Sequence, residues 1–307
     1  MKAALEWRGV AKRFGKTRAL DGLTLAVPTG SITGLVGSNG AGKTTAMAIA
    51  GGMTTPDAGA AILFGEAPFD PDRHAGRLSL LPQDSELPRE GRARELLAFY
   101  GQLQGLDGRT AVAEADRMLE HVHLTDRARS PARTLSHGMR KRVMIAQCFL
   151  GAPEVVLLDE PLSGLDPREV AHMRDFIVAQ RKRRTIVISS HNLHEIELLC
   201  DHVAFVEKGR TVRSGPIEAI TGSRGVLVYT LAAGAEPPED ALASGVTGAA
   251  FVFNADDGTL TCRFDADGTT PDAVNALVLR LLLDSSVPIL AVTQGTRLES
   301  EYLRHSG

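Results

Sequence analysis

One short stretch of this chain combines closely spaced glycines with a lysine and two threonines. Residues 37–45 read GSNGAGKTT, which fits the pattern G-x-x-x-x-G-K-[ST]. Glycines let the backbone curl so that successive N–H groups point at one anion, and a helix that begins directly afterwards adds its positive end. We therefore expect a phosphate cradle in which Lys43 reaches the β- and γ-phosphates of a nucleotide and the Thr44 hydroxyl binds Mg²⁺. The residues expected to bind the nucleotide are Gly37, Ser38, Asn39, Gly40, Ala41, Gly42, Lys43, Thr44 and Thr45.

The alternative interpretation of this stretch is an ordinary glycine-rich turn. By chance the pattern arises in roughly one chain of this composition in a hundred. Here it lies between an apolar run at 31–36, typical of a strand, and a helical run at 46–50. Strand, glycine loop and helix in that order favour a nucleotide site.

Two carboxylates follow a wholly apolar run at 155–158, which is typical of a buried parallel strand. Ligands bind at the carboxyl ends of such strands. We expect Asp159 to hold Mg²⁺ directly or through water, and Glu160 to orient or deprotonate the attacking water. The alternative is a strand that ends in two solvated acids. The glycine loop makes the catalytic interpretation the stronger one.

Two further polar residues follow predicted strands. Gln83 comes after a short strand at 78–81, where its amide can reach a metal ion or water. His191 ends a strand at 185–190, level with the ends that carry Asp159 and Gln83, and is placed to touch a γ-phosphate. Taken alone, Gln83 would be an ordinary surface residue and His191 a structural one.

The elements that position these residues include two N-terminal strands and a long helix. Residues up to 25 alternate as strands do, and Phe14 between two of them is a candidate to stack on an adenine ring, although a lone Phe is more often core. The helix at 136–147 starts at Ser136, a natural N-cap, and Gly138 exposes backbone N–H at its first turn.

This order of features resembles the ATP-binding subunit of ABC transporters over roughly residues 1–220. The resemblance implies that ATP and Mg²⁺ are the ligands and that the chain hydrolyses ATP. The matching features are Phe14 as adenine-stacking aromatic, 37–45 as Walker A, Gln83 as Q-loop, 135–139 as signature sequence, 155–160 as Walker B with its glutamate, 163–166 as D-loop and His191 as switch histidine.

The resemblance also implies partners. In this family a second ATPase subunit, which we expect to be an identical chain, binds head to tail, and its signature helix closes over the ATP. Ser136 and Gly138 would contact the γ-phosphate held by the other subunit. The usual sequence LSGGQ is here LSHGM, so His137 and Met139 depart from the pattern. The power stroke would pass through the Q-loop region to a separate membrane permease.

Composition agrees with a globular protein without strong long-range charge. The chain has 307 residues, 43% of them hydrophobic, and a net charge of −3, so we expect no nucleic-acid partner. The basic run at 181–184 is interpreted as cations at a helix C-terminus rather than an anion patch. Three cysteines without metal spacing suggest a reducing compartment. No apolar run is long enough to span a bilayer.

The predicted fold class is α/β, a P-loop nucleotide-binding domain with a helical subdomain, followed by a small α+β domain. The expected boundaries are 1–220 for the first domain, with its helical subdomain at about 84–150, and 221–307 for the second. The second domain carries no catalytic motif, so a packing or partner-binding role is favoured over a small-molecule sensor. We expect a final short helix at 298–303, and a plain turn rather than a calcium loop at 265–268.

The predicted function is an ATPase subunit at the cytoplasmic face of the cell membrane that powers a permease. The ending at 298–303 and the Gly138-Met139 signature resemble subunits for export of drugs, polysaccharides or haem, which favours an exporter. The alternative is a soluble ABC ATPase that acts on ribosomes or DNA. That class usually carries two ATPase halves or a long coiled-coil insert, and neither is present. The cargo is not readable from this chain.

Overall fold

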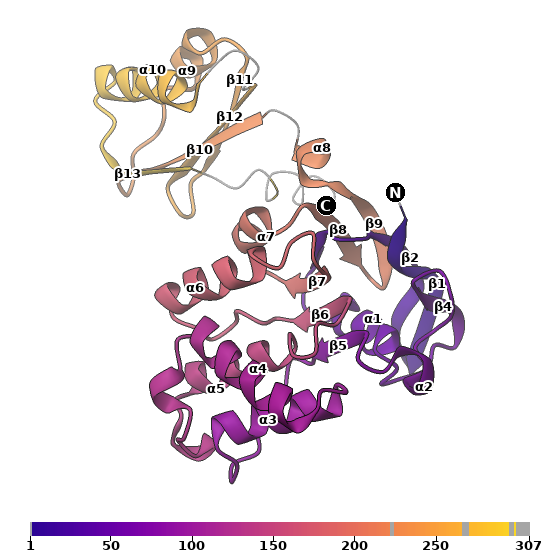
Figure 1. Cartoon of the computed structure of the whole chain (residues 1–307). Helices are drawn as coiled ribbons and strands as arrows, with labels where there is room; N and C mark the ends of the chain where they lie inside the picture. The colour runs from indigo at the N-terminus through magenta and orange to yellow at the C-terminus, as the bar shows by residue number, and fades with distance from the viewer. Residues whose placement is uncertain (1, 222–223, 266–269, 295–297, 299–307) are drawn as a thin grey trace. The chain divides into compact units, whose positions relative to one another are not determined.

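The computed structural model describes residues 2–221, 224–265, 270–294 and 298. The chain divides into two compact units, Met1–Gly215 and Pro216–Gly307. The first unit holds two sheets and most of the helices, and the second holds one sheet (Figure 1). Each unit is described by itself.

A three-stranded antiparallel sheet, in the order β2-β1-β4, opens the first unit. Its strands alternate between buried apolar and exposed side chains, as a half-buried sheet requires. Trp7 is fully buried, and its indole N–H donates to the carbonyl of Ala46 at 2.9 Å, which ties this sheet to the helix that follows the glycine loop. The strands are β1 (Ala3–Phe14), β2 (Thr17–Pro28) and β4 (Ala58–Leu63).

The second sheet has six strands in the order β5-β6-β7-β3-β8-β9, and neighbours from β5 to β8 run parallel. Every residue of β3, β6 and β7 is buried, as expected for parallel strands covered on both faces. Parallel strands end at one edge, so the residues that follow β3, β5, β6 and β7 meet there. The strands are β3 (Ile32–Val36), β5 (Leu78–Leu81), β6 (Val155–Asp159), β7 (Thr185–Ser190), β8 (His202–Glu207) and β9 (Arg210–Pro216).

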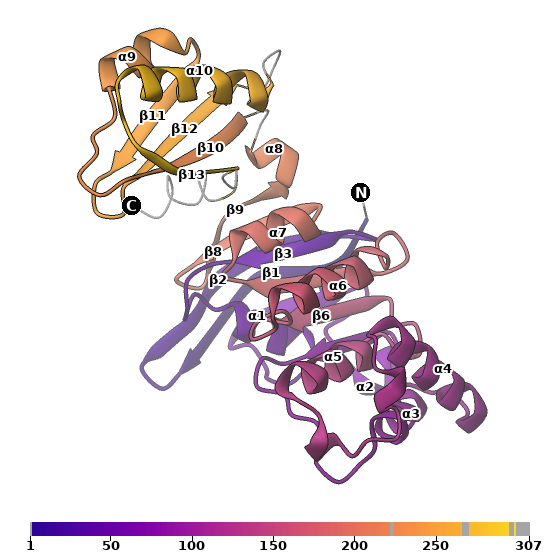
Figure 2. The same cartoon turned by 90° about the vertical axis from the view of Figure 1, so that its left-hand side faces the viewer.

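Helices cover both faces of the six-stranded sheet (Figure 2). Helix α1 (Lys43–Ala50) packs in the core that the two sheets share, with Leu35 of β3. Helix α7 (Leu193–Leu199) packs on the other face. Its Ile196 side chain lies so close to Gly34 of β3 that a Cβ built on this glycine would be 2.6 Å from it. Helix α6 (Pro167–Val178) lies beside α7.

A helical subdomain separates β5 from β6. Helices α3 (Ala93–Leu103) and α4 (Gly108–His121) pack on each other, and both contact α5 (His137–Gln147). Asp107 caps α4 by accepting two backbone N–H groups, and Ser136 caps α5. The sequence analysis did not predict the short helix α2 (Pro71–His74).

The second unit is an antiparallel sheet in the order β11-β12-β10-β13, with two helices packed on it. Helix α9, which begins at Glu239, was not predicted from the sequence. A final helix at 298–303 lies, apart from Leu298, outside the described residues, as does most of the turn at 265–268. The elements are α8 (Ile217–Thr221), β10 (Arg224–Leu231), α9 (Glu239–Gly245), β11 (Ala249–Asn254), β12 (Thr259–Asp265), α10 (Pro271–Asp284) and β13 (Ile289–Gln294).

The basic run 181–184 follows α6, and two of its arginines form hydrogen bonds with other parts of the fold. The Arg181 guanidinium donates to the carbonyl of Leu199 at 2.9 Å, and Arg184 donates to Gln180 at 2.6 Å and to the carbonyl of Phe149 at 3.3 Å. In the described part of the chain, none of the helices has the length and apolar character needed to cross a membrane.

Candidate active site

The glycine loop adopts a backbone that only glycine fits at two places. A Cβ on Gly37 would lie 2.3 Å from the carbonyl oxygen of Val206. Gly42 has φ of +108° and is the N-cap of α1, and a Cβ there would lie 2.6 Å from the carbonyl oxygen of Ala19. The loop therefore turns tightly into α1, and the first N–H groups of that helix point out of the loop as anion donors.

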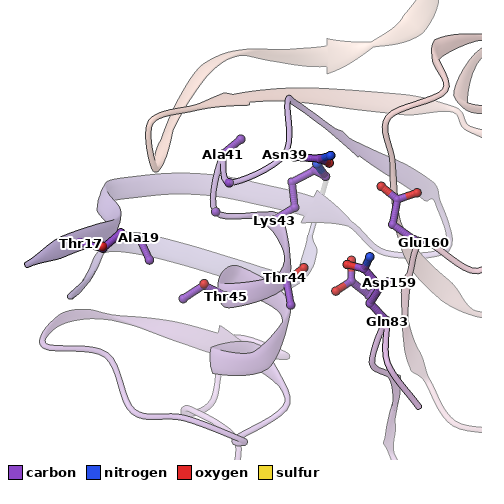
Figure 3. Close-up of a pocket in the computed structure, with 12 residues that line it drawn as sticks. Thr17, Ala19, Asn39, Ala41, Lys43, Thr44, Thr45, Gln83, Asp159 and Glu160 are labelled. Carbon is purple, nitrogen blue, oxygen red and sulfur yellow. The ribbon is translucent and has the colours of Figure 1, made fainter. Parts of the chain in front are cut away.

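The loop borders a cavity of about 430 Å³ at the carboxyl edge of the six-stranded sheet. Figure 3 shows the loop residues on one side of the cavity and Gln83, Asp159 and Glu160 across from them. The cavity thus unites three separately predicted segments. Thr17 and Ala19 of β2 also line the cavity, but they carry no motif and were not predicted from the sequence. The lining residues are Thr17, Ala19, Asn39, Gly40, Ala41, Gly42, Lys43, Thr44, Thr45, Gln83, Asp159 and Glu160.

A serine that the sequence analysis did not single out positions both carboxylate residues. The Ser189 hydroxyl donates to Oδ1 of Asp159 and accepts the backbone N–H of Glu160 at 2.9 Å. Ser189 is opposite Asp159 in the register of β6 and β7, and it is fully buried. The signal available in the sequence was a serine two residues before His191, in a strand whose middle residues are apolar. Oδ2 of Asp159 is buried and has no hydrogen-bond partner among the described residues.

Glu160 has an unusual backbone and one polar partner at its carboxylate. Its φ is +47°, a conformation rare for a residue with a side chain and common at functional sites. Nδ1 of His191 lies 3.1 and 3.2 Å from the two carboxylate oxygens of Glu160. The Glu160 side chain is 8% exposed and that of His191 is 63% exposed. The imidazole can therefore orient the carboxylate while its ring faces solvent.

The charged groups of the cavity act on one another. The Lys43 ammonium donates to the carbonyls of Gly37 at 2.7 Å and Ser38 at 3.2 Å. Burial lowers the pKa of Lys43, and the nearby carboxylates of Glu160 and Asp159 oppose that shift. A buried lysine beside two carboxylates is a charge arrangement typical of sites that bind phosphates and a divalent cation.

Five predicted nucleotide contacts are not among the residues that line the cavity. Two of them, Gly37 and Ser38, belong to the glycine loop, and their carbonyls accept the Lys43 ammonium. The other three are Phe14, Ser136 and Gly138. Phe14 is 53% exposed at the end of β1, with the Lys12 ammonium 5.5 Å from its ring centre. Ser136 caps α5, where its hydroxyl accepts the N–H of Met139 at 3.2 Å. Gly138 lies in the first turn of the same helix. Ser136 and Gly138 therefore belong to a different surface of this unit from the phosphate cradle.

His137, one of the two departures from the signature sequence, lies against the loop that follows β6. A Cβ built on Gly164 would lie 3.2 Å from Nε2 of His137, and one built on Gly138 would lie 3.5 Å from the side chain of Leu165. The first turn of α5 and the segment 163–166 are thus packed together within one chain.

Comparison with known proteins agrees with this geometry. The family described as "ABC transporter" matches residues 20–163. The chain is 36% identical over 223 residues to Nod factor export ATP-binding protein I of Burkholderia lata, with 72% of this chain and 73% of the relative covered. It is 36% identical over 222 residues to daunorubicin resistance ATP-binding protein DrrA3 of Streptomyces coeruleorubidus, with 71% and 69% covered.

A solved structure described as an ATP binding subunit of an ABC transporter superposes with a TM-score of 0.65 at 27% identity, covering 71% of this chain and 91% of its own. The fold and the cavity define a P-loop ATPase with a helical subdomain and an added C-terminal antiparallel sheet. The chain belongs to the ATP-binding subunits of the ABC transporter family, and it is an ABC transporter ATPase.

Proposed function

We propose that this chain is the ATPase subunit of a bacterial exporter and works at the cytoplasmic face of the membrane with a separate permease. The observation that carries the hydrolytic part is the convergence of the glycine loop, Asp159 and Glu160 on one cavity. Support for export comes from relatives named for Nod factor export and daunorubicin resistance, which align with 72% and 71% of the chain.

In this proposal Glu160 is the group that orients and deprotonates the attacking water. Its carboxylate lines the cavity and is nearly buried, so it is placed to accept a hydrogen bond from a water molecule inside the cavity. His191 orients that carboxylate through Nδ1 and can also reach the γ-phosphate. Lys43 moves its ammonium from loop carbonyls to phosphate oxygens, where charge develops as the terminal phosphoryl group is transferred.

The cavity also offers the oxygen donors that Mg²⁺ prefers. Oδ2 of Asp159 is buried without a partner among the described residues, and Thr44 and Gln83 line the same cavity. A carboxylate, a hydroxyl and an amide oxygen fit a hard divalent cation. When bound, Mg²⁺ neutralises charge on the phosphates. Asp159, held by Ser189, would be its anchor, with Thr44 and Gln83 completing the protein side of the site.

We further propose that two identical chains bind head to tail. The cradle contacts one side of a triphosphate, so the other side needs donors from elsewhere. Ser136 and Gly138 stand at the N-terminus of α5, outside the cavity, where a second copy could present them to the γ-phosphate. Phe14, exposed near the cavity residue Thr17, is available to stack on the adenine ring.

We assign the nucleotide chemistry to residues 1–220 and an accessory role in packing or partner binding to 221–307. All cavity residues belong to the first unit, Met1–Gly215. The second unit is built around an apolar core that includes Tyr229 and Leu260.

The test is recovery of tagged protein from detergent-solubilised bacterial membranes, with mass spectrometry of the proteins that accompany it. The proposal expects a multi-spanning membrane protein in near-equal amount. Recovery with ribosomes or DNA, and no membrane protein, would contradict the transport assignment and leave the ATPase assignment standing. A matched sample of Lys43→Ala protein shows whether recovery depends on nucleotide.

A further inference from the structure

Two side chains of the basic run 181–184 are used neither by the fold nor by the nucleotide cavity. Arg181 and Arg184 donate hydrogen bonds to other parts of the chain. Lys182 and Arg183 are exposed, and among the described residues neither side chain forms an ion pair or a hydrogen bond. Both residues line a cavity of about 230 Å³ that shares no lining residue with the nucleotide cavity.

This second cavity is formed by segments that lead into the strands of the six-stranded sheet. Arg77 directly precedes β5, Glu154 directly precedes β6, and Thr185 is the first residue of β7, and all three line the cavity. The nucleotide cavity borders the carboxyl ends of the same parallel strands. The second cavity therefore lies at the opposite, amino edge of the sheet, and a ligand there would not compete with nucleotide.

Hydrogen bonds hold the wall of this cavity in one backbone geometry. The N–H of Lys182 donates to the carbonyl of Gly30 at 3.0 Å, and the N–H of Gly30 donates to the Thr185 hydroxyl at 2.9 Å. Lys182 has φ of +66°, so these contacts hold it in a left-handed conformation that is rare for a residue with a side chain. The N–H of Glu154 donates to the carbonyl of Arg77 at 2.9 Å. The cations of the wall thus stand on a fixed backbone.

The two carboxylates that line the cavity already have a cationic partner. The Arg77 guanidinium lies 2.6 Å from the carboxylate of Glu154 and 3.4 Å from that of Glu66. Its central carbon also lies 3.9 Å from the ring centre of Phe64, which fixes the guanidinium over an aromatic face. One arginine therefore engages both acidic residues of the lining.

The remaining cations of the lining have no carboxylate partner in the part of the chain that the structure describes. These are Lys2, Lys182 and Arg183, together with Arg184, which is 9% exposed and held by the hydrogen bonds given above. Like charges gathered at one cavity repel one another, and a bound anion relieves that repulsion. Ammonium and guanidinium groups are the usual partners of phosphate oxygens, and a phosphate monoester carries a charge of about −1.5 to −2 at pH 7.

We propose that this cavity is an anion site that binds a phosphate monoester group, contacted by Lys2, Lys182 and Arg183. Water occupies about 30 Å³ per molecule in the liquid, so the cavity has room for the phosphate group and part of the molecule that carries it. Soluble phosphate esters and the headgroup of phosphatidic acid both present this group. The site is separate from the nucleotide chemistry and does not depend on the proposed function.

The test is acylation of lysines on the full chain, read residue by residue by mass spectrometry. Lys2 and Lys182 are the reporters, and Lys16 and Lys208, which are exposed and outside the cavity, are the references. Acylation is compared in glycerol 3-phosphate and in glycerol with sodium chloride at equal ionic strength. We expect a Kd on the order of 1 mM, so that about 10 mM ester slows acylation of both reporters several-fold and leaves the references unchanged. Because each lysine is read separately, phosphate at the glycine loop does not affect the result.

Variants distinguish a defined site from diffuse attraction. Arg183→Ala keeps both reporters and should raise the Kd about tenfold, since it removes a charged hydrogen-bond donor. Arg109→Ala is the matched control, because Arg109 is exposed, lies outside the cavity and has no ion pair among the described residues. Lys2→Ala, read at Lys182, carries the same expectation should Arg183→Ala fail to fold. Reporters that are not protected in wild type, or equal losses in Arg183→Ala and Arg109→Ala, would overturn the proposal.

Flotation with vesicles identifies the source of the phosphate group. Phosphatidylcholine vesicles are compared with vesicles that also contain phosphatidic acid. If the ligand is the lipid headgroup, wild type and Arg109→Ala float with phosphatidic acid and Arg183→Ala does not. If the ligand is a soluble ester, glycerol 3-phosphate protects the reporters and no protein floats. Neither protection nor flotation would show that the cavity is not a phosphate site.

Discussion

Replacing Ser189 with alanine would remove the group that holds both carboxylate residues of the cavity. Its hydroxyl donates to Oδ1 of Asp159 and accepts the N–H of Glu160 at 2.9 Å. Since Oδ2 of Asp159 has no partner among the described residues, the variant would leave both oxygens of this buried carboxylate without one. The Glu160 N–H, at a residue whose φ is already +47°, would also lose its acceptor.

The size of the effect follows from these two hydrogen bonds. A hydrogen bond to a charged group contributes about 1.5–3 kcal/mol, and an unsatisfied buried N–H costs about 1–3 kcal/mol. We expect the free energy of unfolding to fall by about 3 kcal/mol, within that combined range. If the activation free energy of hydrolysis rises by about 2 kcal/mol as a result, kcat falls about 30-fold. The KM for ATP should change little, because Ser189 does not line the cavity.

Steady-state ATP hydrolysis and urea unfolding of the same preparations measure both effects. Ser190→Ala is the matched control, because Ser190 is the next residue and is also buried. Its hydroxyl donates to Glu195 and accepts the N–H of Asn192, and it forms no hydrogen bond with Asp159 or Glu160 among the described residues. Ser189→Thr keeps a hydroxyl and should retain most of the activity. A Ser189→Ala protein with wild-type kcat would refute the positioning argument.

Three further predictions concern the cradle, the second unit and the cysteines. Lys43→Ala should raise the Kd for ATP at least about tenfold in calorimetry, since it removes a charged hydrogen-bond donor from the phosphates; unchanged affinity would contradict the cradle. Gly225→Ala places a Cβ 2.1 Å from the Phe264 ring, so unfolding followed by circular dichroism should show a loss of about 1–3 kcal/mol, with ATP hydrolysis retained. Burial raises the pKa of Cys148 to about 12, so the thiol stays protonated up to alkaline pH and should resist thiol reagents at pH 8 until the protein unfolds. Because this pKa is higher in the folded protein than in the unfolded chain, its contribution to stability is fully present below the pKa of the unfolded chain and is lost as the pH rises above it. Rapid labelling of native Cys148 would contradict its burial.

Much of the site could be predicted because its chemistry is local in sequence. The glycine loop follows the buried strand β3, Asp159 ends the buried strand β6 and Glu160 follows it, and parallel strands bring their ends to one edge. That rule alone places Gln83 and His191 near them. The family resemblance contributed what one chain cannot contain, namely the second subunit and the permease.

The residues that were missed depend on contacts distant in sequence. Ser189 acts only because the register of β6 and β7 sets it opposite Asp159. Thr17 and Ala19 reach the cavity because β2 passes beside the glycine loop.

Helix α9 was missed for a different reason. It starts after Pro238 with no side-chain cap, and its seven residues include Ser244 and Gly245, which are poor helix formers. Leu242 is buried in the core of the second unit, so tertiary packing rather than local preference forms this helix. Short helices of this kind have no periodic signal to find.

In the proposed function Glu160 activates the water that hydrolyses ATP held between two copies of this chain. The most direct measurement is light scattering of Glu160→Gln after gel filtration in ATP and Mg²⁺, together with its rate of ATP hydrolysis. We predict a mass of two chains with ATP and one chain without, ATP binding retained, and hydrolysis nearly abolished. A protein that remains a monomer in ATP and hydrolyses it at the wild-type rate would contradict the account.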